Sequence, residues 1–174
     1  MLVKKAAFTL IELLVTLLVL CVALVIALPA LSNMLMNNRL TAYTDMFVNA
    51  LNYARNNALN ESMNVIVCPF GAAQSTTCGG NWGAGWIVVT QPTAGAGILL
   101  QSQQFFPSDP TLSGTVASVT FDPHGLTSTP SNFKFCDSRG GTFARSIEVL
   151  ATGFVQSGST PGQAVWDNSA LACP

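Results

Sequence analysis

The chain opens with a long apolar stretch. Between residues 8 and 31 the clearly polar positions are Thr9, Glu12 and Thr16. A helix over this stretch is about 36 Å long at ~1.5 Å per residue, which is enough to cross a bilayer core of about 30 Å. Two lysines precede it, and the positive-inside rule then places the N-terminus in the cytoplasm and the rest of the chain outside. We therefore predict a membrane-spanning helix segment over residues 8–31.

A secretory signal peptide and a plain membrane anchor are the alternatives for this segment. A signal peptide usually has a shorter apolar region followed by a cleavage site of small residues. Here the run is longer, and Leu28-Pro29-Ala30 matches such a site poorly. A plain anchor explains neither Glu12, because a carboxylate is costly in hydrocarbon, nor the helical pattern that follows.

The helical pattern continues beyond Pro29 with a different character. Apolar residues recur at spacings of three and four, which predicts an amphipathic helix over residues 32–60. Its apolar side needs a folded domain to cover it. Pro29 cannot donate a backbone hydrogen bond, so we expect a kink there in one continuous helix. The residues of the predicted apolar stripe are Leu40, Tyr43, Phe47, Leu51, Ala54 and Ala58.

Residues 61–174 show short β-branched and aromatic runs separated by Gly, Pro and Asn, which predicts antiparallel strands. Polar loops are expected over residues 127–132 and 157–163. The predicted strands are Asn64–Cys68, Trp86–Thr90, Ile98–Phe105, Val116–Phe121, Phe133–Asp137, Ser146–Leu150 and Gly153–Gln156.

Composition and motifs narrow the function. The net charge is −1 and only 9% of residues are charged, which argues against a generally basic nucleic-acid binder. The sequence has no phosphate loop and no nucleophile elbow. Its one histidine, His124, lies in a turn without a nucleophile or metal partner. We expect no enzyme, no cofactor, no metal site and no small-molecule substrate. Trp82 and Trp86 are expected in the core.

Four cysteines lie beyond the apolar run, and an even number there predicts two disulfides and an oxidising compartment. The sequence alone allows three pairings. We favour Cys68 with Cys78, which closes a short loop, and Cys136 with Cys173, which fastens the C-terminal tail to a strand.

The stretch Ala7-Phe8-Thr9-Leu10-Ile11-Glu12 resembles the prepilin cleavage and methylation motif of type IV pilins and type II secretion pseudopilins. The resemblance implies that a prepilin peptidase removes residues 1–7 and that the new amine of Phe8 is methylated. The family usually has Gly where this chain has Ala7. It also implies that Glu12 meets the terminal amine of a neighbouring subunit during assembly, although Glu12 equally suits the positive end of its own helix dipole.

Motifs in the domain are similar to the FimT/FimU–GspH branch of minor pilins and pseudopilins. They are Val67-Cys68-Pro69, the Asn81–Val88 stretch, Phe121-Asp122-Pro123-His124-Gly125 and Phe135–Gly140. The implied fold is α+β and type IV pilin-like, with a long N-terminal helix packed on antiparallel sheets. The implied function is that of a minor pilin in pilus assembly, initiation or tip formation. A type II secretion pseudopilin H is the first alternative.

A DNA-binding competence pilin is the second alternative. Members of the branch that are thought to contact DNA carry G-R-x-R, but Gly153-Phe154-Val155-Gln156 lacks both arginines. Lys134, Arg139 and Arg145 could still cluster at one sheet end and contact phosphate weakly. The partners implied are other pilin subunits, the peptidase and the inner membrane. The implied location is a single-pass inner-membrane protein with a periplasmic domain, which later enters a pilus or pseudopilus.

Overall fold

The computed structural model describes residues 9–92, 95–107 and 110–173. It contains one long helix, α1 (Leu10–Glu61), and two short 3-10 helices, η1 (Trp82–Ala84) and η2 (Gly141–Phe143). Two compact units divide the chain, one up to Asn37 and the other from Asn38. The strands are β1 (Asn64–Pro69), β2 (Gly85–Gln91), β3 (Leu99–Gln104), β4 (Thr111–Gly114), β5 (Val119–Phe121), β6 (Ser131–Cys136), β7 (Arg145–Val149) and β8 (Val155–Ser157).

The first unit is the N-terminal part of α1. Nearly all of its side chains are exposed, including every large apolar residue from Leu10 to Leu35. Among the described residues, α1 is the one helix that is long and apolar enough to cross a membrane. Pro29 lies inside α1, and the helix continues through it. The expected kink at Pro29 stays a prediction.

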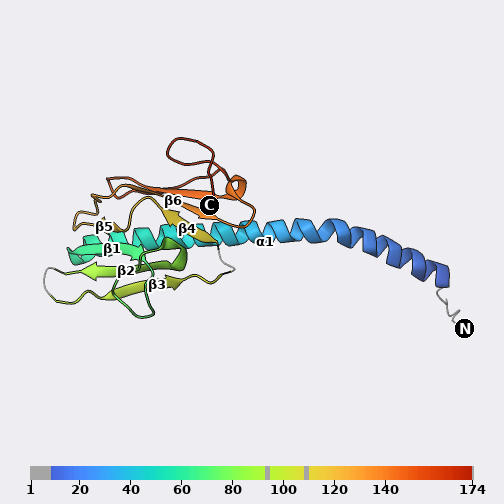
Figure 1. The fold of residues 1–174 in the computed structure, drawn as a ribbon, viewed down its shortest axis with the longest axis horizontal. Coiled ribbons are helices and arrows are strands. Elements are labelled where there is room, and N and C mark those ends of the chain that lie inside the picture. The colour runs from blue at the N-terminus through green and yellow to red at the C-terminus, as the bar shows by residue number, and fades with distance from the viewer. Residues whose placement is uncertain (1–8, 93–94, 108–109, 174) are drawn as a thin grey trace, which may run out of the picture. The chain divides into compact units, whose positions relative to one another are not determined.

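The second unit combines the remainder of α1 with two antiparallel sheets (Figure 1). Sheet A has the strand order β3-β2-β1-β5, and sheet B has the order β4-β6-β7-β8. Within the described residues no ladder joins the two sheets. The predicted α+β fold class, with one long helix packed on antiparallel sheets, is therefore confirmed.

All seven predicted strands are present, with shifted ends. β5 is shorter than the predicted Val116–Phe121, and β6 begins at Ser131, inside a predicted loop. The sequence analysis missed β4, whose Thr111-Leu112-Ser113-Gly114 contains a single large apolar residue. β4 exists because it pairs with β6, in the register Leu112↔Phe135.

The predicted apolar stripe of α1 forms the core of the second unit. Five of its six residues are buried, and Tyr43 is half-buried, with its ring centroid 5.3 Å from that of Phe105. The stripe is wider than predicted, because Thr44 and Ala50 are also buried. Thr44 tolerates burial because its hydroxyl donates to the Leu40 carbonyl, 2.7 Å away.

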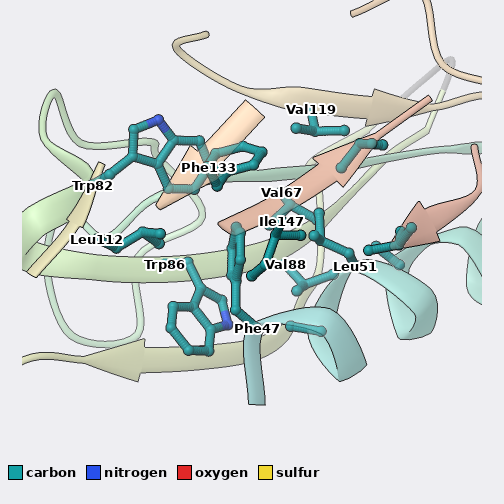
Figure 2. Close-up of a cluster of buried hydrophobic side chains, with 14 of the residues drawn as sticks. Phe47, Leu51, Val67, Trp82, Trp86, Val88, Leu112, Val119, Phe133 and Ile147 are labelled. Carbon is teal, nitrogen blue, oxygen red and sulfur yellow. The ribbon is translucent and has the colours of Figure 1, made fainter. Parts of the chain in front are cut away.

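Phe47 is the residue that connects both sheets. Its ring centroid lies 5.0 Å from that of Trp86 in β2 and 5.0 Å from that of Phe133 in β6 (Figure 2). Trp82 lies 5.0 Å from Phe133, and its indole N–H donates to the Val116 carbonyl at 2.7 Å. Both tryptophans are buried, which agrees with their predicted place in the core.

Two disulfides fasten the second unit, in the pairs favoured from the sequence. Cys68 at the end of β1 bonds Cys78, ten residues further along the chain. Cys136 at the end of β6 bonds Cys173, 37 residues further along. The second bond holds the C-terminal tail to the end of β6, and within the tail the Leu171 N–H donates to the Gly162 carbonyl at 2.9 Å.

Candidate functional site

Glu12 takes part in a reciprocal cap at the start of α1. The Glu12 N–H donates to Thr9 Oγ1 at 3.3 Å, while the Thr9 N–H and hydroxyl each lie 3.4 Å from Glu12 Oε2. Thr9 immediately precedes the helix and Glu12 is the third helical residue, which is the spacing of a capping box. The carboxylate thus also lies at the positive end of the helix dipole.

Glu12 has no ionic partner within the described part of the chain. Its carboxylate is exposed among exposed apolar side chains, with Ile11 and Leu13 on either side. Both hydrogen bonds that the carboxylate accepts from Thr9 are to Oε2. The predicted cleavage and methylation residues, Ala7 and Phe8, lie outside the described residues.

Two of the three candidate DNA-contact residues lie on opposite faces of sheet B. Arg145 is directly opposite Phe135, a core residue, and donates to Thr41 Oγ1 of α1 at 3.4 Å. Lys134 is adjacent to Phe135 in β6 and therefore points to the other face, where its ammonium donates to the Ala172 carbonyl. Strand register therefore places these two side chains on opposite faces, and the expectation that the three cations cluster at one sheet end stays a prediction.

Arg139, the third cation, is engaged by its own loop. Its Nη2 lies 2.7 Å from Asp137 Oδ2 and its Nε 3.0 Å from the same oxygen. The guanidinium also stacks over Phe143, 4.1 Å from the ring centroid. Both charged side chains are only 12% exposed. A phosphate would have to displace an established ion pair to bind here.

Arg55 joins the end of α1 to two turns, a role that the sequence analysis did not find. Its Nε donates to the Gly125 carbonyl at 2.9 Å and its Nη2 to the Thr152 carbonyl at 3.2 Å. Gly125 and Gly153 both have a φ of +72°. A Cβ on Gly153 would lie 1.9 Å from the Gly125 carbonyl oxygen, so the turns meet closely only because residue 153 is a glycine.

The remaining polar residues are engaged in a turn or in a pair of strands. Asp122 Oδ1 accepts from the His124 and Leu126 N–H groups at 2.8 and 2.9 Å, and the His124 side chain is exposed. Glu148 accepts from Gln156 at 2.6 Å. In the described ranges no group of three or more His, Cys, Asp or Glu side chains could hold a metal ion.

An exposed apolar helix segment, together with a helix covered by two antiparallel sheets, matches the fold expected from the resemblance to type IV pilins and pseudopilins. The family model described as type II transport protein GspH matches residues 44–153, more than half of the sequence. The chain therefore belongs to the GspH family. The prokaryotic N-terminal methylation motif matches residues 2–28.

Two crystal structures of the type IV minor pilin FimU from Pseudomonas aeruginosa have a similar fold. One is 18% identical with a TM-score of 0.55, and the match covers 68% of this chain and 92% of the FimU chain in that crystal structure. The other is 18% identical with a TM-score of 0.56, covering 71% and 95%. At this identity the likeness concerns the fold. No curated protein sequence matches the chain.

Proposed function

We propose that this protein is a structural, non-enzymatic minor pilin that takes part in assembling, initiating or capping a type IV pilus. The observation that carries the proposal is Glu12, a carboxylate held at the start of an apolar helix segment whose side chains are nearly all exposed. Such a surface requires lipid or other helices around it. The methylation motif over residues 2–28 and the FimU-like fold support the same function.

Glu12 is the proposed subunit-assembly contact. Cleavage after Ala7 by a prepilin peptidase would leave an amine, later methylated, on Phe8. A carboxylate in an apolar setting is costly alone and far less so beside a cation. With Oε2 occupied by Thr9, Oε1 can accept from the terminal amine of a neighbouring subunit.

The proposed topology follows from the same helix. Residues 8–31 span the inner membrane with the N-terminus in the cytoplasm, and residues 32–60 continue as the helix of a periplasmic domain over residues 61–174. The two disulfides fit an oxidising compartment. Extraction from the membrane then moves the chain into a filament with other pilin subunits.

The test replaces Glu12 with alanine in the full chain. We expect membrane levels to stay unchanged and the amount of the chain in sheared filaments to fall at least tenfold. The amount of Glu12→Gln in filaments should fall similarly, because the amide keeps the size of the side chain but loses its charge. Thr16→Ala, also in the apolar segment, is the matched control and should assemble normally. Normal assembly of Glu12→Ala would refute the proposal.

A type II secretion pseudopilin H is the second candidate, favoured by the family description that matches residues 44–153. Deletion of the gene separates the two candidates. Loss of piliation or twitching with normal secretion supports the pilus function. Accumulation of secretion substrates in the periplasm with normal piliation supports the pseudopilin.

DNA binding has less support, because Lys134 and Arg145 lie on opposite faces of sheet B and Arg139 is paired with Asp137. We expect no gel shift of duplex DNA by the full chain in detergent at low salt. A salt-sensitive shift that Arg139→Ala and Arg145→Ala together abolish would instead establish the competence function.

A further inference from the structure

β3 forms one edge of sheet A, and its outer side is open. It pairs with β2 through the register Gly85↔Gln104, Trp86↔Gln103 and Ile87↔Ser102. Sheet A ends at β3, since β1 and β5 lie on the far side of β2. In the described part of the chain, no backbone hydrogen bond joins β3 to any strand other than β2.

The direction of the unpaired groups can be assigned from the ladder. The N–H of Phe105, directly after β3, donates to the Ala84 carbonyl at 3.0 Å, on the β2 side. Backbone groups of successive residues in a strand alternate in direction. The N–H and C=O groups of Gln103 therefore face β2, and those of Ser102 and Gln104 face away from it. The Gln104 carbonyl accepts from the side-chain Nε2 of Gln103 at 3.0 Å. Both Ser102 and Gln104 are exposed.

The other three sheet edges are shorter, and two of them are covered. β5 has three residues, its Thr120 N–H donates to Thr129 Oγ1 at 3.5 Å, and Phe121 bridges Thr127. β4 has four residues, and η1 lies against it, with Gly83 near Thr111. β8 has three residues. β3, with six residues, offers the longest edge.

β3 has one irregularity, a register shift in its ladder with β2 between Val88 and Val89, but it lacks the side chains that usually protect an exposed edge. Such edges commonly carry a charged side chain or a proline. The sequence Leu-Leu-Gln-Ser-Gln-Gln has neither. Exposed apolar side chains flank the strand instead, with Ile98 66% exposed and Phe106 64% exposed. An edge of this kind pairs readily with another extended chain.

We propose that the outer edge of β3 is a docking site for an extended, uncharged strand of the neighbouring subunit in the filament. The inference rests on the proposed function, because it takes its partner from the assembly. The N–H and C=O groups of Ser102 and the N–H group of Gln104 bond the added strand, and Ile98 and Phe106 bury apolar side chains at its two ends. Because β3 has no charged side chain, a charged side chain on the added strand would find no counter-ion in β3. An uncharged strand therefore fits this edge better than a charged one.

The test is Ser102→Pro in the full chain. Proline removes one outward N–H without removing a bond to β2, and edge strands accept it where the N–H faces outward. Ser102→Ala, the matched control, changes the side chain but keeps the N–H. We expect both variants to reach the membrane at wild-type levels and to melt within a few degrees of the wild type. Incorporation into sheared filaments should fall at least tenfold for Ser102→Pro only.

Hydrogen exchange of the unmutated chain gives a second measurement, which does not depend on the variant folding. In the isolated chain in detergent, the amides of Ser102 and Gln104 should exchange freely, and that of Gln103 should be protected. In the filament all three should be protected. A cross-linker placed at Gln104 should join the chain to an extended segment of another filament subunit.

Three results would overturn the inference. The first is wild-type incorporation of Ser102→Pro, and the second is unchanged exchange at Ser102 and Gln104 in the filament. The third is cross-linking only to a second copy of this chain before assembly. If the wild-type chain never enters filaments, the proposed function fails and the inference fails with it. If only the β3 experiments give a contrary result, the proposed function still stands on the Glu12→Ala test.

Discussion

The two parts of α1 contrast sharply although they form one helix. Up to Asn37 almost every side chain is exposed, and Leu20 retains 54% of its surface. Beyond Asn37 a stripe is buried, and Leu51 has an exposed fraction of 0%. The first part is apolar on all sides, whereas the second is apolar on one side. The contrast shows that burial is decided by what covers the helix, and only the second part carries its cover within the chain.

The largest expected effect tests this contrast directly. Phe47→Ala should lower the free energy of unfolding of the second unit by about 3–5 kcal/mol, because the ring fills the space between both sheets and α1. Urea unfolding of the full chain in detergent, followed by tryptophan fluorescence, measures it. Leu20→Ala is the control from the first part and should leave the transition unchanged. Equal losses for both variants would contradict the contrast.

The disulfides should give the next largest effect. Replacing both Cys136 and Cys173 with serine should cost about 2–4 kcal/mol. The corresponding change at Cys68 and Cys78 should cost about 1 kcal/mol less in the chain-entropy account, because that loop is shorter. The same urea unfolding under non-reducing conditions checks both, and membrane insertion of the first part should not change. A larger loss of unfolding free energy on removing the Cys68–Cys78 bond would contradict the predicted order of the two disulfides.

Arg55→Met should have a smaller effect. It removes two hydrogen bonds from a charged donor to the Gly125 and Thr152 carbonyls, and should cost about 1–3 kcal/mol. Arg39, exposed on the same helix, provides the control, and Arg39→Met should change the unfolding free energy by less than about 0.5 kcal/mol. Similar values for the two arginines would show that the Arg55 contacts contribute little.

The smallest expected effect lies at the start of the first part. Thr9→Ala removes one side of the capping box and should weaken the first helical turn by about 1 kcal/mol. Amides of that turn should then exchange about fivefold faster, since ~1.4 kcal/mol corresponds to a factor of about ten. The melting temperature of the second unit should stay the same. Thr16→Ala, within the helix, should leave exchange in the first turn unaltered.

Local patterns predicted much of the fold because they are physical causes of it. Spacings of three and four residues specified the α1 stripe, and alternating runs specified seven strands. β4 was missed because pairing with β6, and not its own composition, makes it a strand. Thr44 was missed because its buried hydroxyl bonds to its own helix.

The candidate site was predicted less completely than the fold. The Thr9-x-x-Glu12 spacing was available in the sequence as a capping signal, although Glu12 was assigned only to the dipole and to assembly. The separation of Lys134 from Arg145 depends on strand register, which a single sequence does not provide. The Arg55 contacts join residues 70 and 97 positions apart, and no local signal reports them.

In the ranges that the structure describes no ladder joins the two sheets, and this has a mechanical consequence. Sheets A and B are hydrogen-bonded within themselves, and the buried stripe of α1, with Phe47 at its centre, contacts both. A tensile load applied along this part of the helix is therefore shared between the sheets through interlocked side chains. The Arg55 bonds to the two turns resist sliding at the end of the helix. Under such a load we expect the side-chain packing between α1 and the sheets to shear before the backbone hydrogen bonds within either sheet break.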